Sequence, residues 1–148
     1  MLKKVITFED YNGEMRTEDH YFGLNETELL KKDIKTPGGL KELINRMIQT
    51  KDGAAILELF DELVTHAYGI KSPDGRKFIK SPEISRDFMQ TEAYNQLVLE
   101  LFSGGEEAMA AFVEGLLPQK LVLQAKLEEA KNEEKAVNNG TPTSINNA

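Results

Sequence analysis

The sequence predicts a mainly α fold with an N-terminal β-hairpin. This is an α+β class, with a compact helical domain followed by a C-terminal helix and a disordered tail. Three observations predict it. Asn12-Gly13 lies between two stretches of alternating apolar residues, which is typical of a hairpin turn. From about residue 40 to residue 117, apolar residues recur at helical spacing. The stretch after residue 137 is polar and uncharged, a composition that cannot bury a core.

The predicted hairpin has a two-residue loop, Asn12-Gly13, because both central positions of a type I′ turn need positive φ. This register pairs Tyr11 with Glu14, Glu9 with Arg16, and Thr7 with Glu18, and it gives an apolar face of Ile6, Phe8, Met15 and Tyr21. A three-residue loop would place Phe8 opposite Arg16 and set Asp10 against Glu14, a like-charge pair. The two-residue loop is therefore favoured.

Two helices are expected directly after the hairpin. Asn25 and Glu28 have capping-box spacing and open the first, which extends to about Lys35. Thr36-Pro37 supplies an N-cap and a first-turn proline for the second. The apolar stripe of the second helix is Leu40, Leu43, Ile44, Met47 and Ile48.

A third helix is capped by Asp52 and ends at Tyr68-Gly69, where the glycine is expected in the left-handed conformation. Its broad apolar stripe makes it the expected centre of the core: Ile56, Leu59, Phe60, Leu63, Val64 and Ala67. After it, Pro73-Asp74-Gly75 predicts a surface loop or a small second hairpin.

The fourth and fifth helices complete the predicted domain. Ser81-Pro82 begins the fourth, a single helix that runs to Phe102. A capping box of Ser103 and Glu106 begins the fifth, which ends near Pro118. The expected organisation is a hairpin plus helical domain over residues 1–118, a charged amphipathic helix over 119–137 and a disordered tail over 138–148.

Composition narrows the function classes. The 148 residues contain no cysteine, so disulfides and thiolate metal sites are excluded. No stretch approaches the length of apolar residues that a membrane span needs, and no signal peptide is evident, so a soluble protein of the cytoplasm is expected. The net charge of −7 repels phosphate backbones and argues against nucleic acid as a partner.

Motifs for chemistry are missing, so an enzyme is not expected, nor is a cofactor or a metal. The two histidines, His20 and His66, lack the companion ligands of a zinc site and are interpreted as structural. Adjacent carboxylates are explained by helix starts and polar faces. Neither glycine pair has phosphate-loop spacing, and no nucleophile motif is present, although a triad assembled from distant residues stays open.

One basic cluster stands out against the acidic chain: Lys71, Arg76, Lys77 and Lys80, with Phe78 between them. Basic groups interleaved with an aromatic residue are the minimum for contact with RNA. A solvated turn or a patch for an acidic protein partner fits the overall charge better.

The run YGIKSPDGRKFIKSPEISRDFMQTEAYNQLVLELF, residues 68 to 102, resembles the small tail assembly chaperones of siphovirus-like phages of Gram-positive bacteria. The matching features are Tyr-Gly before a Lys-Ser-x-Asp-Gly-Arg turn, an aromatic-Ile-Lys-Ser helix start and a Phe-x-Gln-Thr-x-Ala-Tyr segment. The opening hairpin and the close formed by Ala110, Phe112, Gly115 and Pro118 are also similar. The resemblance spans residues 3 to 118.

The resemblance implies a non-enzymatic protein that binds the tape-measure protein and keeps it soluble during tail assembly. It also implies a host-cytoplasmic protein that is absent from the mature virion, and a tail-tube partner through a frameshifted longer form. Self-association through the hairpin edge is a further expectation. As a hypothesis, the partner-binding residues are Phe112, Leu116, Leu117 and Leu121. The alternatives are a neck or tail-completion component of the virion and an adaptor for host machinery.

Overall fold

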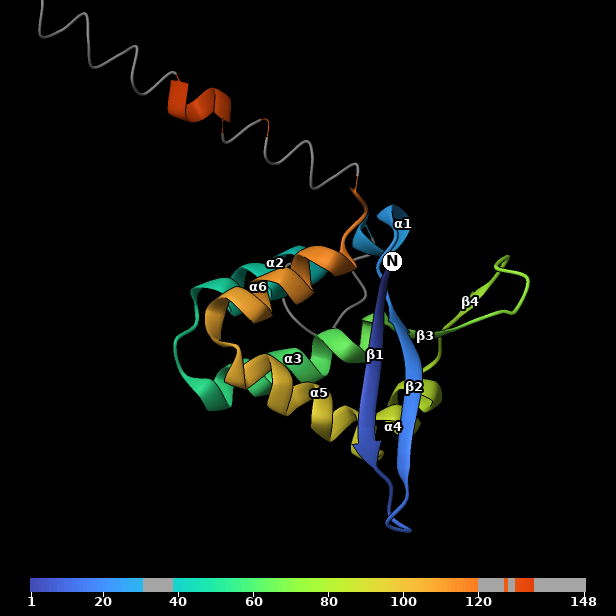
Figure 1. Cartoon of the computed structure of the whole chain (residues 1–148). Coiled ribbons are helices and arrows are strands. Elements are labelled where there is room, and N and C mark those ends of the chain that lie inside the picture. The colour runs from blue at the N-terminus through green and yellow to red at the C-terminus, as the bar shows by residue number, and fades with distance from the viewer. Residues whose placement is uncertain (31–38, 120–126, 128–129, 135–148) are drawn as a thin grey trace, which may run out of the picture. The chain divides into compact units, whose positions relative to one another are not determined.

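We describe a computed structural model, which places residues 1–30, 39–119, 127 and 130–134 (Figure 1). The chain divides into two units, Met1–Pro118 and Gln119–Ala148. In the second unit, residues 119, 127 and 130–134 are helical. The rest of the predicted 119–137 helix, the predicted tail, the start of the second helix at Thr36-Pro37 and the end of the first at Lys35 lie outside the described residues.

The first unit is an α+β fold, as predicted, with an antiparallel sheet of order β1-β2-β3-β4. The long hairpin is formed by β1 (Leu2–Glu9) and β2 (Met15–Phe22), and the short one by β3 (Tyr68–Lys71) and β4 (Phe78–Ile79). Figure 1 shows α2, α3, α5 and α6 on one side of β1 and β2, while the β3–β4 hairpin projects on the other side, with α4 next to β3.

The register of the first hairpin differs from the predicted one by a residue. Glu9 pairs with Met15 and Phe8 with Arg16, so the predicted pairs, including Glu9 with Arg16, are wrong. The backbone N of Asp10 donates to Glu14 O at 2.8 Å, and Gly13 alone in the loop has positive φ, 81°. This is a three-residue loop with glycine in the bulge position.

The side chain of Asp10 explains why the three-residue loop is stable. Its Oδ1 accepts from the backbone N of both Asn12 and Glu14, and its Oδ2 lies 2.6 Å from Arg16 Nε. Arg16 and these loop amides hold the pKa of the Asp10 carboxyl below its usual value. The expected repulsion from Glu14 is therefore offset by donors that face the carboxylate.

The shift of register also changes the apolar face. Ile6 and Phe8 are buried as predicted, but Met15 is 68% exposed and Tyr21 only partly buried. Phe22 takes the inward position opposite Leu2 and is fully buried. A slip of one residue moves every side chain of a strand to the other face, which is the effect seen here.

Tyr68-Gly69 begins β3 instead of closing a helix with a left-handed glycine. Phe22 pairs with Tyr68 and Tyr21 with Gly69, so the second hairpin extends the sheet of the first. A Cβ on Gly69 would lie 2.8 Å from Phe78 Cζ and 3.0 Å from the carbonyl O of Ile79. The glycine is therefore needed for close approach of β4, not for its φ.

The early helices follow their predicted signals where the structure describes them. In α1 (Glu26–Leu30), Asn25 and Glu28 form the reciprocal capping box, with N···O distances of 2.8 and 3.0 Å. The next helices are α2 (Gly39–Gln49) and α3 (Gly53–Ala67). Asp52 Oδ1 caps α3 by accepting from Ala54 N, as predicted.

The predicted fourth helix is two helices, α4 (Pro82–Met89) and α5 (Glu92–Ser103). Ser81 caps α4 as expected, accepting from Ile84 N at 3.1 Å. Thr91 Oγ1 donates to Phe88 O and accepts from Tyr94 N, so this one hydroxyl ends α4 and begins α5. Threonine is a favoured N-cap residue, so Thr91 before Glu92 was a signal for the start of a new helix. The prediction of one continuous helix missed it, because the apolar stripe continues past Thr91.

The last helix of the first unit is α6 (Gly105–Leu116), and its start also differs from the prediction. Ser103 belongs to α5, and Gly104 occupies the N-cap without a side-chain hydrogen bond, so the Ser103–Glu106 capping box is wrong. Gly105, with φ of 73°, makes the tight α5–α6 connection that a side chain would strain.

Phe22 lies at the centre of an aromatic core between the sheet and the helices. Its ring makes edge contacts with Tyr68, Phe88 and Phe112, with centroids 5.3 to 5.6 Å apart. Tyr68 stacks on Phe88 at 4.1 Å with an interplanar angle of 7°. Burial of the Tyr68 phenol raises its pKa to about 12. These contacts tie β2 and β3 to α4 and α6, and they fix the helical layers that carry the site.

Candidate functional site: an apolar groove between two helix pairs

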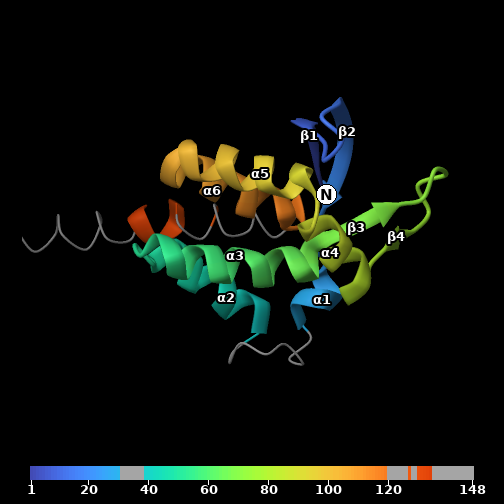
Figure 2. The same cartoon turned by 90° about the horizontal axis from the view of Figure 1, so that it is seen from below.

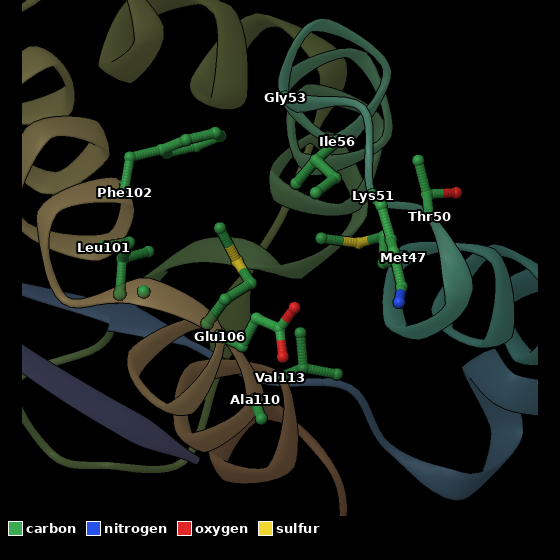
Figure 3. A pocket seen from close by; sticks show the side chains of 12 residues that line it. Met47, Thr50, Lys51, Gly53, Ile56, Leu101, Phe102, Glu106, Ala110 and Val113 are labelled. Carbon is green, nitrogen blue, oxygen red and sulfur yellow. The ribbon is translucent and has the colours of Figure 1, made fainter.

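The candidate site is an open apolar groove within the first unit. It lies where α2 passes into α3 and where α5 passes into α6, and its volume is about 370 Å³ (Figure 3). Figure 2 shows two helix pairs, α2 beside α3 and α6 beside α5. Twelve described residues line it: Met47, Thr50, Lys51, Gly53, Ile56, Leu101, Phe102, Gly105, Glu106, Met109, Ala110 and Val113.

The groove has a buried floor and an accessible upper part. Met47, Leu101 and Val113 are buried and form the floor. Phe102 is 37% exposed, and in Figure 3 its ring and the side chain of Ile56 extend toward each other from opposite walls. Apolar atoms are therefore left accessible in a concave place, where burying them against a partner is favourable.

The ionisable groups of the described lining are one base and one acid. Lys51 comes from the α2–α3 loop and Glu106 from the first turn of α6, and both are exposed. None of the twelve lining residues is a histidine, and none is a serine. The lining therefore suits apolar side chains of a polypeptide, with a polar contact of either sign at the rim.

The four residues predicted to bind a partner lie in different environments. Phe112 is 3% exposed and packs against Phe22 and Phe60 inside the core, and Leu116 is fully buried. Leu117 is partly exposed, and Leu121 lies outside the described residues. None of the three described members lines the groove, although Val113, next to Phe112 in α6, does.

Six of the twelve groove residues continue the apolar stripes of their helices, and for that reason the sequence placed them in the core: Met47, Ile56, Leu101, Phe102, Met109 and Val113. The available signals were the two methionines, Met47 and Met109, since flexible thioether side chains are frequent on adaptable binding surfaces. Gly104-Gly105 marks the tight turn after which α6 separates from α5. Neither signal shows that the apolar stripes of the α2–α3 and α5–α6 helix pairs leave an open groove between them.

The basic cluster is divided by the structure. Lys71, Arg76 and Lys77 belong to the β3–β4 hairpin, but Lys80 turns inward. Its Nζ donates to both carboxylate oxygens of Glu28, at 2.9 and 2.8 Å, and to the carbonyl O of Gly23 and of His66, at 2.5 and 3.0 Å. Burial lowers the pKa of Lys80, which Glu28 opposes. Lys80 is thus a structural tie, not a surface charge.

His20 has hydrogen-bond partners at both ring nitrogens. Nδ1 lies 2.9 Å from Tyr68 Oη and Nε2 lies 3.0 Å from Glu18 Oε1, while the ring packs on Phe88 with centroids 4.8 Å apart. Among the described residues, no group of three or more His, Cys, Asp or Glu side chains is placed to hold a metal ion. Within the same residues, none of the helices has the length and apolarity to span a membrane.

Comparisons with known proteins show which family the chain belongs to. A family model described as phage tail assembly chaperone matches residues 1–147. Comparisons with curated proteins and with solved structures gave no match. The match covers nearly the whole chain and includes the groove and all elements of the first unit. The chain therefore belongs to the phage tail assembly chaperone family, which supports a chaperone role in tail assembly and an interaction with tail proteins.

Proposed function

We propose that this chain binds the tape-measure protein in the host cytoplasm and keeps it soluble while the tail is assembled, without catalysing a reaction. The family gives the chaperone role, and the apolar groove is the observation that supports a client of this kind. A tape-measure protein is a very long helical chain, so it presents many apolar side chains that need cover before the tube encloses them.

In this proposal the groove takes one or two apolar side chains from a client helix. In a common mode of peptide recognition, a helix inserts apolar side chains at helical spacing into a hydrophobic groove. Met47 and Met109 can adjust to anchors of different shape, which suits a client whose successive segments differ. Each contact is weak by itself, and many chaperone copies on one long client add their contacts without a strong single site.

The partner residues proposed here are the accessible members of the groove, above all Phe102, Met109 and Ala110. Leu117, which is partly exposed, and Leu121 stay proposed contacts. Phe112 and Leu116 pack in the core of the isolated chain, so a contact through them would require α6 to move. A tail-tube partner recruited by a frameshifted longer form and self-association also stay proposals.

Co-expression with the phage's longest open reading frame tests the function. We expect the tape-measure candidate to be found in the soluble fraction only when this chain is present. Ala110→Glu places a charge in the groove and should abolish the effect. Ala111→Glu is the matched control, because the substitution adds the same charge at a residue that is also exposed but does not line the groove. Equal solubility of the client without this chain would refute the proposal.

The alternative, a neck or tail-completion component, differs in where the chain ends up. A chaperone leaves before the tail is complete, so mass spectrometry of purified virions should not detect it. A stoichiometric amount in virions would favour the structural component. For an adaptor of host machinery, deletion would leave tails intact, whereas a chaperone deletion yields heads without tails.

A further inference from the structure

The β3–β4 hairpin is a second surface that the groove does not explain. We use the name arm for residues 70–79, which extend beyond the rest of the sheet and project from the first unit (Figures 1 and 2). The sheet face that carries Tyr68 is covered by α4 at Tyr68, where the phenol stacks on Phe88. Ile70, two residues further along β3 on the same face, is no longer covered by α4.

The uncovered face of the arm carries a pair of isoleucines. Ile70 and Ile79 are direct cross-strand partners, so their side chains point to the same side. They are 50% and 47% exposed. Two β-branched side chains, side by side on a strand pair and half open to water, form a small flat apolar surface that would gain free energy from cover.

The arm is held in shape by its own turn. Ser72 N donates to Lys77 O, Ser72 Oγ donates to Asp74 Oδ1, and Lys77 N donates to Ser72 Oγ, all between 2.7 and 2.9 Å. Gly75, with φ of 76°, occupies the position that needs a left-handed residue. The surface is therefore preformed, and a partner does not have to order it.

The charge of the arm is opposite to that of the chain as a whole. Arg76 and Lys77 lie in the turn beyond the isoleucine pair and line a shallow hollow of about 480 Å³ at the tip. Lys71, the neighbour of Ile70 in β3, points to the opposite face of the arm, where its Nζ lies over the Tyr21 ring. The one acid of the arm, Asp74, accepts from Ser72 Oγ and Arg76 N, and these bonds lower the pKa of its carboxyl. A basic surface on a chain of net charge −7 favours an acidic partner.

We infer that the arm is a docking surface for an acidic polypeptide segment of another protein, one whose apolar side chains cover Ile70 and Ile79 while its carboxylates meet Arg76 and Lys77 at the tip. This site lies outside the groove and does not depend on the tape-measure proposal.

Nucleic acid fits the arm less well, because the aromatic rings near it are already covered. Phe78 lies against Gly69 on one side, and Lys80 Nζ is 5.3 Å from its ring centroid. Lys71 Nζ lies 5.4 Å from the ring centroid of Tyr21. Both rings are partly buried and already have a neighbour, which leaves less of each ring for a base to stack on, and stacking is the main sequence-tolerant contact to single strands.

Fluorescence anisotropy with three labelled probes tests the inference on the full chain. The probes are a short amphipathic peptide of leucine and glutamate, the same peptide with lysine for glutamate, and a single-stranded oligouridylate. We expect the acidic peptide to bind, with an affinity that falls as salt rises. Binding of the lysine peptide or of the RNA with equal or higher affinity would overturn the inference.

Variants then locate the binding. The double substitution Ile70→Thr with Ile79→Thr keeps β-branched side chains and should lower the affinity for the acidic peptide about tenfold or more. The double substitution Arg76→Gln with Lys77→Gln should lower this affinity by a similar factor. Val5→Thr, at an exposed position of β1, is the matched control and should have no effect. Loss of peptide binding in Ala110→Glu, with both arm variants unchanged, would assign the peptide to the groove and refute the arm as its site.

Discussion

Lys80 and Glu28, 52 residues apart in the sequence, form a largely buried ion pair in which Nζ lies 2.8 and 2.9 Å from the two carboxylate oxygens. Glu28 also accepts from Asn25 N in the capping box of α1, and Lys80 also donates to the carbonyl groups that follow β2 and end α3. One ammonium group thus joins α1, the end of β2 and the end of α3 to the start of α4.

Replacing Lys80 should therefore destabilise the whole first unit. Lys80→Met keeps the aliphatic length but leaves a part-buried carboxylate and two carbonyl groups without this donor, so we expect a loss of about 2–4 kcal/mol in the free energy of unfolding. Urea denaturation followed by circular dichroism measures it. Lys77→Met, at an exposed position of the arm, is the control and should stay within about 0.5 kcal/mol of the wild type.

Glu28→Gln separates charge from hydrogen bonding at the same place. Glutamine keeps an oxygen that can accept from Asn25 N and from Lys80, so the expected loss is smaller, about 1 kcal/mol. A loss for Glu28→Gln as large as that for Lys80→Met would show that the charge alone matters.

Phe112 and Phe102 should respond differently to truncation, because one lies in the core and the other at the groove. Phe112→Ala removes the ring that contacts Phe22 and Phe60 and should cost about 3–5 kcal/mol in unfolding free energy. Phe102→Ala removes a ring that is 37% exposed and should cost less, about 1–2 kcal/mol. Thermal unfolding of the two variants compares them directly, and equal losses would contradict the assignment of Phe102 to a binding surface.

Gly69 and Gly53 give opposite expectations for the same substitution. Gly69→Ala would place Cβ against the Phe78 ring and the backbone of Ile79, with an expected loss of about 1–3 kcal/mol. Gly53→Ala, at the first residue of α3 with no atom within 4 Å of the new Cβ, should stabilise by about 0.4–1 kcal/mol. Chemical denaturation checks both, and a tolerated Gly69→Ala would show that β4 can move away.

The carboxyl of Asp61, which accepts a hydrogen bond from Tyr94 Oη between α3 and α5, has a pKa raised by burial. A raised folded-state pKa means that folding disfavours the charged form relative to the unfolded chain, so this group's contribution to stability falls as pH rises from the unfolded pKa through the folded one. Asp61→Asn should therefore be at least as stable as the wild type at pH 7, and its advantage should shrink at acidic pH. Unfolding at pH 7 and pH 4 measures the difference.

Local signals in the sequence predicted the elements that depend on neighbouring residues. The Asn25–Glu28 box, the Asp52 cap and the Ser81-Pro82 start each involve residues within three positions of one another, so they could be predicted without knowing what packs against the helix. The Ser103–Glu106 box has the same spacing but does not form, because α5 extends through Ser103. The same reasoning misplaced the hairpin register, because it weighed the Asp10–Glu14 pair by charge and not by the loop amides and Arg16 that bind the Asp10 carboxylate.

Long-range relationships were beyond the sequence patterns. The small second hairpin around Pro73-Asp74-Gly75 was one of the two predictions for that turn, and it is present as β3–β4. Nothing near Tyr68 indicates that it pairs with Phe22, 46 residues earlier, and so Tyr68-Gly69 was predicted to end a helix. The groove also depends on long-range packing. Phe102 and Met109 continue the apolar stripes of their helices, and only the packing of α2, α3, α5 and α6 leaves these side chains lining an open groove. Lys80 differs from its prediction in the opposite direction: the sequence places it in a basic surface cluster, but in the fold its side chain points inward to Glu28.

The central claim is that the groove contacts the tape-measure protein, and site-specific photo-crosslinking tests it most directly. A benzophenone amino acid is placed at Ala110 or, as the control, at Ala111, and the chain is co-expressed with the tape-measure candidate and irradiated. The account predicts a covalent adduct with the client from position 110 and little or none from position 111. Adducts of equal yield from both positions, or from position 111 alone, would contradict it.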